Sequence, residues 1–192
     1  MNKLTNTSKE NAVQFFFIAN GFKSTYDYLF NNVFNKVLDT SCNNLSPLVS
    51  NGIFTIEAYF KFLIAFNFYE KGEQNAQIEK THYIDCLFCK LSTETQNKIL
   101  EELKNKDVSE NEFRAFLKEN ANGFIKWRYP SDKSLETDTR IITETIIVLS
   151  KLCKERINIT SVFDGISPNN SYTITITPDL YNDWQTSQNS KQ

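Results

Sequence analysis

The segment that most constrains the fold is residues 50–69, which is apolar on almost every side of a predicted helix. Its apolar members are Ile53, Phe54, Ile56, Ala58, Tyr59, Phe60, Phe62, Leu63, Ile64, Ala65 and Phe66. A helix that is hydrophobic all round lies in the middle of a bundle. Two charged residues interrupt the segment, Glu57 and Lys61, in the order that favours an ion pair between positions i and i+4. The segment therefore predicts a central helix with other helices packed around it.

Helical periodicity continues through most of the chain up to residue 156. With only 5 Gly and 4 Pro in 192 residues, the composition also favours long uninterrupted elements. The further helices expected span residues 8–38 (one helix bent near Gly21, or two helices), 82–91, 93–105, 110–120 and 138–156. Residues 39–50 are rich in turn formers and are expected to form a loop.

Several helix starts carry capping signals. Ser8 is expected to cap the first helix. The pairs Thr93/Gln96 and Ser109/Glu112 have the spacing of capping boxes, in which each residue satisfies an N–H group of the other. Together with the periodicity, these signals predict an all-α bundle of about five to seven helices.

The C-terminal part of the chain has a different pattern. Residues 171–177 (SYTITIT) alternate between apolar residues and threonines, which is typical of a β-strand. A single strand needs a partner, which residues 163–167 or a second copy of the chain could supply. We therefore expect a helical domain over residues 1–157 and a short C-terminal extension over residues 158–192, with one or two strands and a flexible end.

Composition excludes several classes of function. The 21 basic and 23 acidic residues give a net charge of −2, which argues against strong nonspecific binding of nucleic acid. The single histidine, His82, excludes a two-histidine zinc hydrolase, and the scattered glycines form no phosphate-binding loop. No secretory signal opens the chain, and the longest apolar run, residues 59–68, is shorter than the roughly 20 residues needed to cross a bilayer. We therefore expect a cytoplasmic protein without membrane contact, whose four cysteines are thiols.

Three stretches in the middle of the chain resemble the HEPN family of helical domains. Residues 51–61 (NGIFTIEAYFK) place a Glu and a Lys at i and i+4 in an apolar helix. Residues 81–91 (THYIDCLFCKL) resemble the stretch that follows in many members, and residues 124–129 (FIKWRY) resemble a signature near the last part of the bundle. The match covers about residues 50–155, in the family's order and spacing.

The resemblance implies a HEPN-like bundle and a role in a prokaryotic defence or toxin-type system that binds or cleaves RNA. Ribonuclease members carry Arg-x(4–6)-His on a late helix. Here Arg128 is followed at those distances by Lys133, Ser134 and Leu135, so the motif is missing. Ribonuclease activity would then rest on analogy of fold.

His82 and Arg128 are the candidate catalytic residues. A histidine titrates near neutral pH and can act as an acid or base, and a guanidinium next to aromatic residues suits phosphate. The alternatives are structural: His82 could bond to backbone at a helix start, and Arg128 could form a buried ion pair with Glu57 or Asp132.

The candidate binding residues are Glu57, Lys61, Trp127 and Tyr129. Glu57 and Lys61 could line a polar slot in the bundle, or form a local salt bridge that extends to solvent.

His82, Cys86 and Cys89 share one helix face and could ligate zinc, but free cysteines are also common core residues. We expect no metal and no cofactor.

Two functions remain open: RNA binding or metal-independent RNA cleavage at His82 and Arg128, or a non-enzymatic protein–protein interaction or dimerisation module. The expected partners are a second copy of the chain, RNA or a nucleotide, or another protein. The many aromatic residues of the first helix and the lone strand favour a homodimer.

Overall fold

The computed structural model describes residues 7–34, 42–73, 78, 81–123, 127, 137–160 and 173–175. The chain divides into two compact units, residues 1–150 and 151–192. The division falls within the last long helix.

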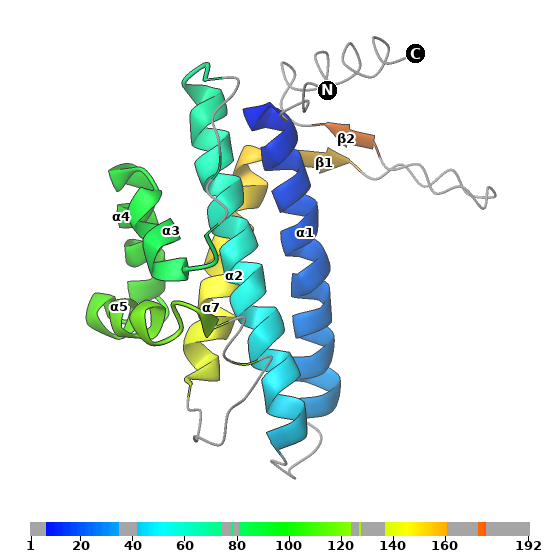
Figure 1. Ribbon diagram of the computed structural model, residues 1–192, viewed down its shortest axis with the longest axis vertical. Coiled ribbons are helices and arrows are strands. Elements are labelled where there is room, and N and C mark those ends of the chain that lie inside the picture. The colour runs from blue at the N-terminus through cyan, green and yellow to red at the C-terminus, as the bar shows by residue number, and fades with distance from the viewer. Residues whose placement is uncertain are drawn as a thin grey trace, which may run out of the picture. The chain divides into compact units, whose positions relative to one another are not determined.

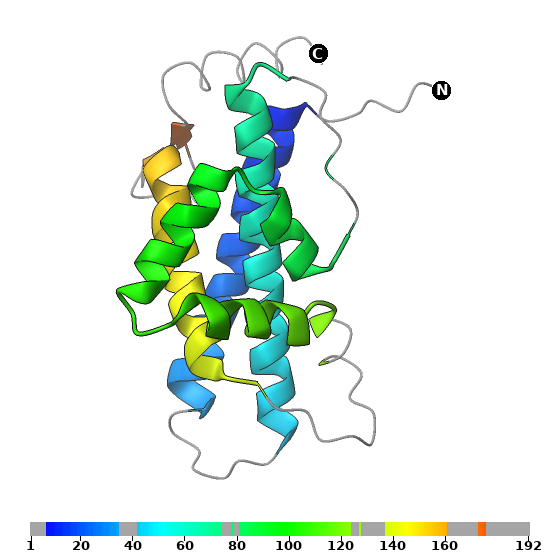
Figure 2. The ribbon, with the colours of Figure 1, turned by 90° about the vertical axis from the view of Figure 1, so that its left-hand side faces the viewer.

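The regular elements in the described residues of the first unit are all helices, which confirms the all-α prediction there. Its elements are α1 (Ser8–Leu29), the π-helical turn η1 (Phe30–Phe34), α2 (Cys42–Glu70), α3 (Ile84–Lys90), α4 (Thr93–Lys104), α5 (Glu110–Glu119) and the first part of α7 (Thr139–Arg156). Helices α1 and α2 lie side by side along most of their length (Figure 1). Helices α3, α4 and α5 form a layer on the side of α2 away from α1, and α5 crosses the direction of α2 (Figure 2).

Helix α2 is the central helix that the sequence predicts, and nearly every side chain from Ile53 to Phe66 is buried. It begins at Cys42, however, so the expected loop over residues 39–50 is wrong for most of its length. Pro47 lies near the start of the helix, where it removes one helical N–H bond. Leu48 and Val49, which follow it, are completely buried. Burial of these two side chains outweighs the missing hydrogen bond.

Helix α1 runs without interruption across Gly21, and the first helical region ends in η1 at Phe34 in the described residues. Its N-cap is Thr7 rather than Ser8. The Thr7 hydroxyl accepts from the Glu10 N–H at 3.2 Å, and the Glu10 carboxylate accepts from the Thr7 N–H at 2.9 Å. The Ser8 hydroxyl instead donates to the carbonyl of Glu73, just after α2.

The two predicted capping boxes have different outcomes. The Ser109/Glu112 box is present at the start of α5. The Thr93/Gln96 box is wrong by one residue, because the Ser92 hydroxyl accepts from the Thr95 N–H at 3.2 Å. The Gln96 amide then donates to the Leu91 carbonyl at 2.9 Å, which fixes the turn between α3 and α4.

Aromatic contacts join the α3–α5 layer to α2. Phe60 of α2 lies 5.8 Å from Phe88 of α3, and Phe88 lies 5.3 Å from Phe113 of α5, measured between ring centroids. These rings are almost completely buried. The position of α3 is therefore set from both sides by close-packed rings.

Helices α1, α2 and α7 meet closely at Gly52. A Cβ atom at this position would lie 2.5 Å from the Ile142 Cγ2 atom and 2.9 Å from the Tyr26 ring. The Tyr26 hydroxyl and the Thr143 hydroxyl are 2.7 Å apart, so the buried phenol keeps a polar partner.

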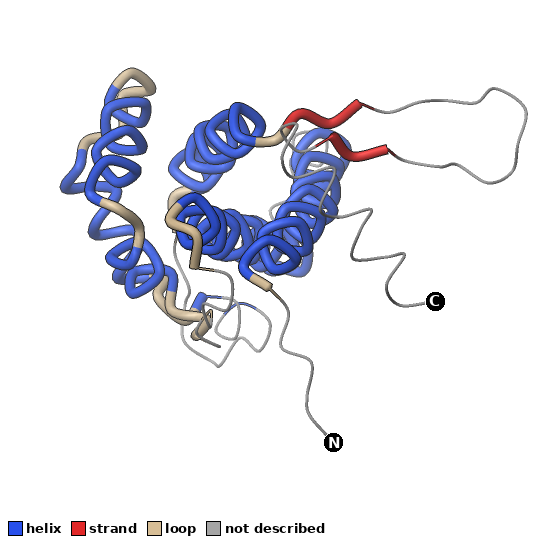
Figure 3. The backbone as a smooth tube through the Cα atoms, turned by 90° about the horizontal axis from the view of Figure 1, so that it is seen from above, coloured by secondary structure: helices blue, strands red, loops and turns tan. Residues whose placement is uncertain are grey.

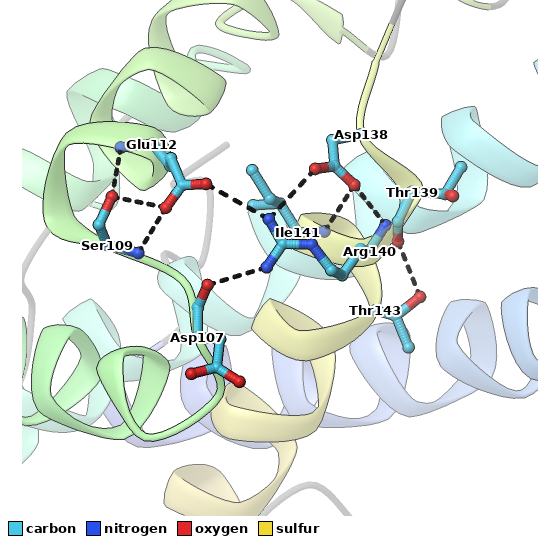
Figure 4. Close-up of polar contacts among 8 residues, drawn as sticks. All are labelled: Asp107, Ser109, Glu112, Asp138, Thr139, Arg140, Ile141 and Thr143. Carbon is cyan, nitrogen blue, oxygen red and sulfur yellow. Dashed lines mark hydrogen bonds and ion pairs between the residues drawn. The ribbon is translucent and has the colours of Figure 1, made fainter.

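A cluster of polar contacts around Arg140 ties the start of α7 to the α4–α5 turn (Figure 4). The guanidinium donates to the Asp107 carbonyl at 3.0 Å and to the carboxylates of Glu112 and Asp138 at 3.4 Å each. The Asp138 carboxylate also accepts from the Arg140 N–H at 2.8 Å. All of these side chains are about half exposed, so the cluster orients the elements more than it stabilises them.

The second unit contains the end of α7 and two short strands, β1 (Asn158–Thr160) and β2 (Thr173–Thr175). They pair antiparallel (Figure 3). In this pair Ile159 lies opposite Ile174. The β2 strand lies within the expected segment 171–177, and its described partner is β1. The expected partner segment, residues 163–167, lies outside the described residues.

Among the described residues, one helix segment, Leu45–Glu70, is long and apolar enough to span a membrane. Of its most apolar window, 83% is buried inside the structure. That burial is typical of the core helix of a water-soluble protein.

Candidate functional site

The candidate site is built around Glu57, a charged residue on the buried helix α2. Only 2% of its side chain is exposed. Its Oε1 atom accepts two hydrogen bonds, from the Lys61 Nζ atom at 2.7 Å and from the His82 Nδ1 atom at 3.0 Å. Its Oε2 atom is buried and has no hydrogen-bond partner in the described part of the chain. The structure thus brings together three of the six residues singled out in the sequence.

Lys61 is held inside the bundle with Glu57. Its side chain is 9% exposed, and its ammonium lies 5.8 Å from the centroid of the Phe15 ring of α1. The Glu57–Lys61 pair is therefore a buried salt bridge and not one that extends to solvent. A buried charge needs a partner of opposite charge, and the spacing of one helical turn lets Glu57 and Lys61 partner each other.

His82 forms the open side of the site, since 48% of its side chain is exposed. An ionised carboxylate can only accept hydrogen bonds, so the Nδ1 atom of His82 carries the proton in this contact. In the neutral ring, the lone pair is then on Nε2. A carboxylate that orients a histidine through Nδ1 is the arrangement that prepares an imidazole for general acid–base chemistry.

The backbone around His82 is fixed by neighbouring elements. The Tyr83 N–H donates to the Thr81 hydroxyl at 3.1 Å, and the Ile84 N–H donates to the Ala121 carbonyl after α5 at 3.1 Å. Ile84 itself is completely buried. The histidine is thus held between α2, which supplies the carboxylate, and α5, which anchors the start of α3.

The remaining candidates have separate positions. Arg128 and Tyr129 lie outside the described residues, so their predicted roles as catalytic and binding residues stay predictions. Trp127 is 3% exposed, and its indole N–H donates to the Asn120 side chain at 3.3 Å. An indole with its polar atom bonded inside the core serves packing, which favours a structural role for Trp127 over ligand binding.

Cys86 and Cys89 of α3 are both exposed instead of belonging to the core. Partial desolvation and the neighbouring Asp85 carboxylate raise the pKa of the Cys86 thiol, which disfavours the reactive thiolate at neutral pH. Within the described residues, no group of three or more His, Cys, Asp and Glu side chains is arranged to hold a metal ion.

The sequence predicts His82 and Arg128 as the catalytic residues and does not predict the contact between Glu57 and His82. One signal could have found it. A carboxylate in a helix that is apolar on all sides requires partners, and the only histidine follows the polar connector that leaves that helix.

Comparisons of the chain with models of protein families, with curated proteins and with solved structures find no match.

Proposed function

We propose that this chain is a HEPN-like protein that binds RNA at a small site around His82 and cleaves it without a metal ion. The observation that carries the proposal is the 3.0 Å contact between the half-exposed His82 imidazole and the buried Glu57 carboxylate. Because the His82 ring of this pair is half exposed, a substrate can reach it and exchange a proton with it. A fully buried pair could not take part in such a transfer. In this proposal His82 is the acid–base group, Glu57 holds its tautomer, and Lys61 balances the charge of Glu57.

The near-neutral net charge supports a small site over a long basic groove. Few phosphate contacts give a shallow dependence of RNA affinity on salt. Arg128 is the expected anion contact, on the strength of its residue type and its place in the FIKWRY stretch. The same proposal includes a cytoplasmic location, a prokaryotic defence or toxin-type system and a C-terminal extension with one or two strands.

The experiment compares cleavage of labelled single-stranded RNA by the wild type and by His82→Ala, in the presence of a chelator. We expect His82→Ala to lower the cleavage rate by about a hundredfold, because general acid–base catalysis contributes about that much or more. Since His82 is half exposed, the variant should fold normally, which circular dichroism checks. Lys104→Ala, an exposed basic residue on α4, is the control and should cleave like the wild type.

Equal cleavage by the wild type and His82→Ala would overturn the catalytic role. RNA binding is measured separately, by fluorescence anisotropy with wild type and Arg128→Ala. If the wild type neither binds nor cleaves RNA, the proposal as a whole is wrong, and a non-enzymatic interaction module becomes the better account.

A further inference from the structure

Two cysteines lie on the exposed face of helix α3. Cys86 and Cys89 are both exposed, whereas Cys153 of α7 is buried. The opposite face of α3 carries its buried residues, Ile84, Leu87 and Phe88. Free cysteines are among the residue types found most often in the core, so two of them on one exposed face depart from the usual pattern. Their thiols do not serve packing, which points to a use of the sulfur atoms themselves.

The exposure of both thiols follows from the way α3 is held in the fold. Phe88 lies between two other rings, 5.8 Å from Phe60 of α2 and 5.3 Å from Phe113 of α5. All three rings are almost completely buried. Close packing on two sides fixes the rotation of α3 about its axis, and the two cysteines therefore stay on the solvent side.

The spacing of Cys86 and Cys89 suits a bond between them. In an α-helix, Cα atoms three residues apart are about 5 Å from each other. Disulfides join Cα atoms that are about 4.4–6.8 Å apart, so the backbone of α3 allows one here. The helix ends directly after this turn, where the Leu91 N–H donates to the Phe88 carbonyl at 3.2 Å. Such a three-residue hydrogen bond tightens the turn, which brings side chains at i and i+3 closer together.

The surroundings of Cys86 keep its thiol protonated. Partial desolvation, the charge of Asp85, a hydrogen bond to the Asp85 carboxylate and the neighbouring Cys89 all raise the pKa of this thiol. Disulfides are easily reduced where the fold stabilises the thiolates of the reduced form. The reduced form has no such stabilisation at Cys86, so a disulfide formed here resists reduction.

We propose that Cys86 and Cys89 form a redox-active dithiol site whose reaction partner is a small-molecule disulfide. Cys89 reacts first, because Asp85 holds the Cys86 thiol in its protonated form. The Cys89 sulfur attacks one sulfur of the small disulfide, whose S–S bond breaks, and one small thiol leaves with the Cys89 proton. The Cys86 sulfur then attacks the Cys89 sulfur, and its proton passes through the Asp85 carboxylate to the second small thiol as this leaves. The chain is oxidised by two electrons, and the small disulfide is reduced to two thiols.

The internal disulfide gives these exposed thiols a reversible end point under oxidising conditions. A mixed disulfide or sulfenic acid on an isolated cysteine has no neighbouring thiol to resolve it, and further oxidation of the sulfenic acid becomes irreversible. Here Cys86 resolves either product on Cys89 within the same helix turn. The reaction uses neither Glu57 nor His82, so this proposal does not depend on the proposed function.

The experiment treats the reduced full chain with oxidised glutathione in native buffer and maps the products by mass spectrometry. Trypsin cleaves after Lys80 and Lys90, so one peptide, residues 81–90, contains both thiols and no other cysteine. The internal disulfide makes this peptide lighter by two hydrogen atoms, whereas each mixed disulfide adds a glutathione. At about 0.1 mM reduced glutathione, the internal disulfide should be at least about tenfold more abundant than the mixed disulfides, since tethered groups reach millimolar effective concentrations.

Two single variants test the order of attack. Cys86→Ser should stop at the mixed disulfide on Cys89, because the resolving thiol is gone. Cys89→Ser should form its mixed disulfide at least about twofold more slowly than Cys86→Ser, because the Cys86 thiolate is scarcer. Equal rates would overturn this order of attack.

A double variant is the control for the spacing. Cys86→Ser/Lys104→Cys again has two exposed thiols, but the second lies at the far end of α4. It should form a mixed disulfide at each position and no internal disulfide. An internal disulfide in this variant would overturn the role of the helix spacing.

A wild-type chain that accumulates mixed disulfides on both cysteines, or that does not react, would overturn the proposal. So would an internal disulfide that forms only in urea, since α3 would then have to unfold first. None of these measurements involves RNA, so they test the dithiol site separately from the role of His82.

Discussion

At the scale of single residues, Glu57 is the clearest case of a side chain whose surroundings decide its role. Its carboxylate is buried, and one oxygen takes both hydrogen bonds while the other takes none in the described part of the chain. Buried ion pairs rarely add stability over apolar residues of similar size, because removing both charges from water costs as much as their attraction returns. Retaining such a pair next to an exposed histidine points to a use other than stability.

This argument gives a prediction for Glu57 and Lys61. Glu57→Gln should lower the free energy of unfolding by about 3–5 kcal/mol, because it leaves the Lys61 ammonium buried without a counter-charge. The double variant Glu57→Leu/Lys61→Met, which removes both charges, should be more stable than Glu57→Gln. Urea unfolding at neutral pH measures both. A double variant less stable than Glu57→Gln would show that the two residues act independently, contrary to their 2.7 Å contact.

Tyr26 gives a pH-dependent prediction. Burial raises the pKa of this tyrosine from its ordinary value of 10.0 to about 12. The folded state therefore holds the phenol proton more tightly than the unfolded state does. The resulting stability is complete below pH 10 and is lost as the pH rises toward 12. Urea unfolding over this range should show a steeper loss for the wild type than for Tyr26→Phe, with a difference of up to about 2–3 kcal/mol. Parallel curves would contradict the assignment.

At the scale of the elements, the sequence predicts which segments are helical more directly than it predicts where each helix begins and ends. The apolar segment 50–69 predicts α2 as the central helix, and the structure buries it as expected. The start of α2 could not be placed from the sequence, because residues 42–50 contain turn formers, including Pro47, but are helical. Burial of Leu48 and Val49 favours the helix there. Likewise, Ser92 and Thr93 are both good N-caps, and only the local backbone decides between them.

The capping box of α5 gives a prediction at this scale. The Ser109 hydroxyl and N–H, and to a lesser degree Arg140, lower the pKa of Glu112 below its ordinary value of 4.5. Because the pKa of Glu112 is lower in the folded state, the contacts of its carboxylate stabilise the fold above pH 4.5. This stabilisation is lost as the pH falls through the pKa of Glu112 in the folded state. Glu112→Ala should therefore lower the melting temperature by a few degrees at neutral pH, and the difference from wild type should shrink in acid.

The control for this prediction is Glu119→Ala at the other end of the same helix. A carboxylate at a helix C-terminus opposes the helix dipole, so its removal should leave the melting temperature unchanged or raise it slightly. If the two variants respond to pH in the same way, the capping contacts of Glu112 are not the cause.

At the scale of the whole molecule, the candidate site combines residues that are distant in the sequence. The i, i+4 spacing of Glu57 and Lys61 predicts their pairing, but the sequence leaves open whether the pair lines a buried slot or extends to solvent. The contact with His82 depends on where the layer of α3, α4 and α5 packs against α2. That position is set by Phe60, Phe88 and Phe113, whose side chains predict burial without predicting partners.

Thiol labelling can report on the stability of the chain near its division into two units. Cys86 and Cys89 are exposed, whereas Cys153 in the last turn of α7 is buried, and its burial raises the pKa of the thiol well above its ordinary value. The variant Cys42→Ser/Cys86→Ser/Cys89→Ser has Cys153 as its only cysteine. The variant Cys42→Ser/Cys89→Ser/Cys153→Ser has Cys86 as its only cysteine.

We expect alkylation of Cys153 in native buffer to be slower than that of Cys86 by about a thousandfold or more, since it requires opening of a cooperative unit. In urea the two rates should converge at the midpoint where circular dichroism shows the helices unfold. Convergence well before that midpoint would mean that the last turn of α7 opens on its own, and equal rates in native buffer would mean that Cys153 is not protected by the fold.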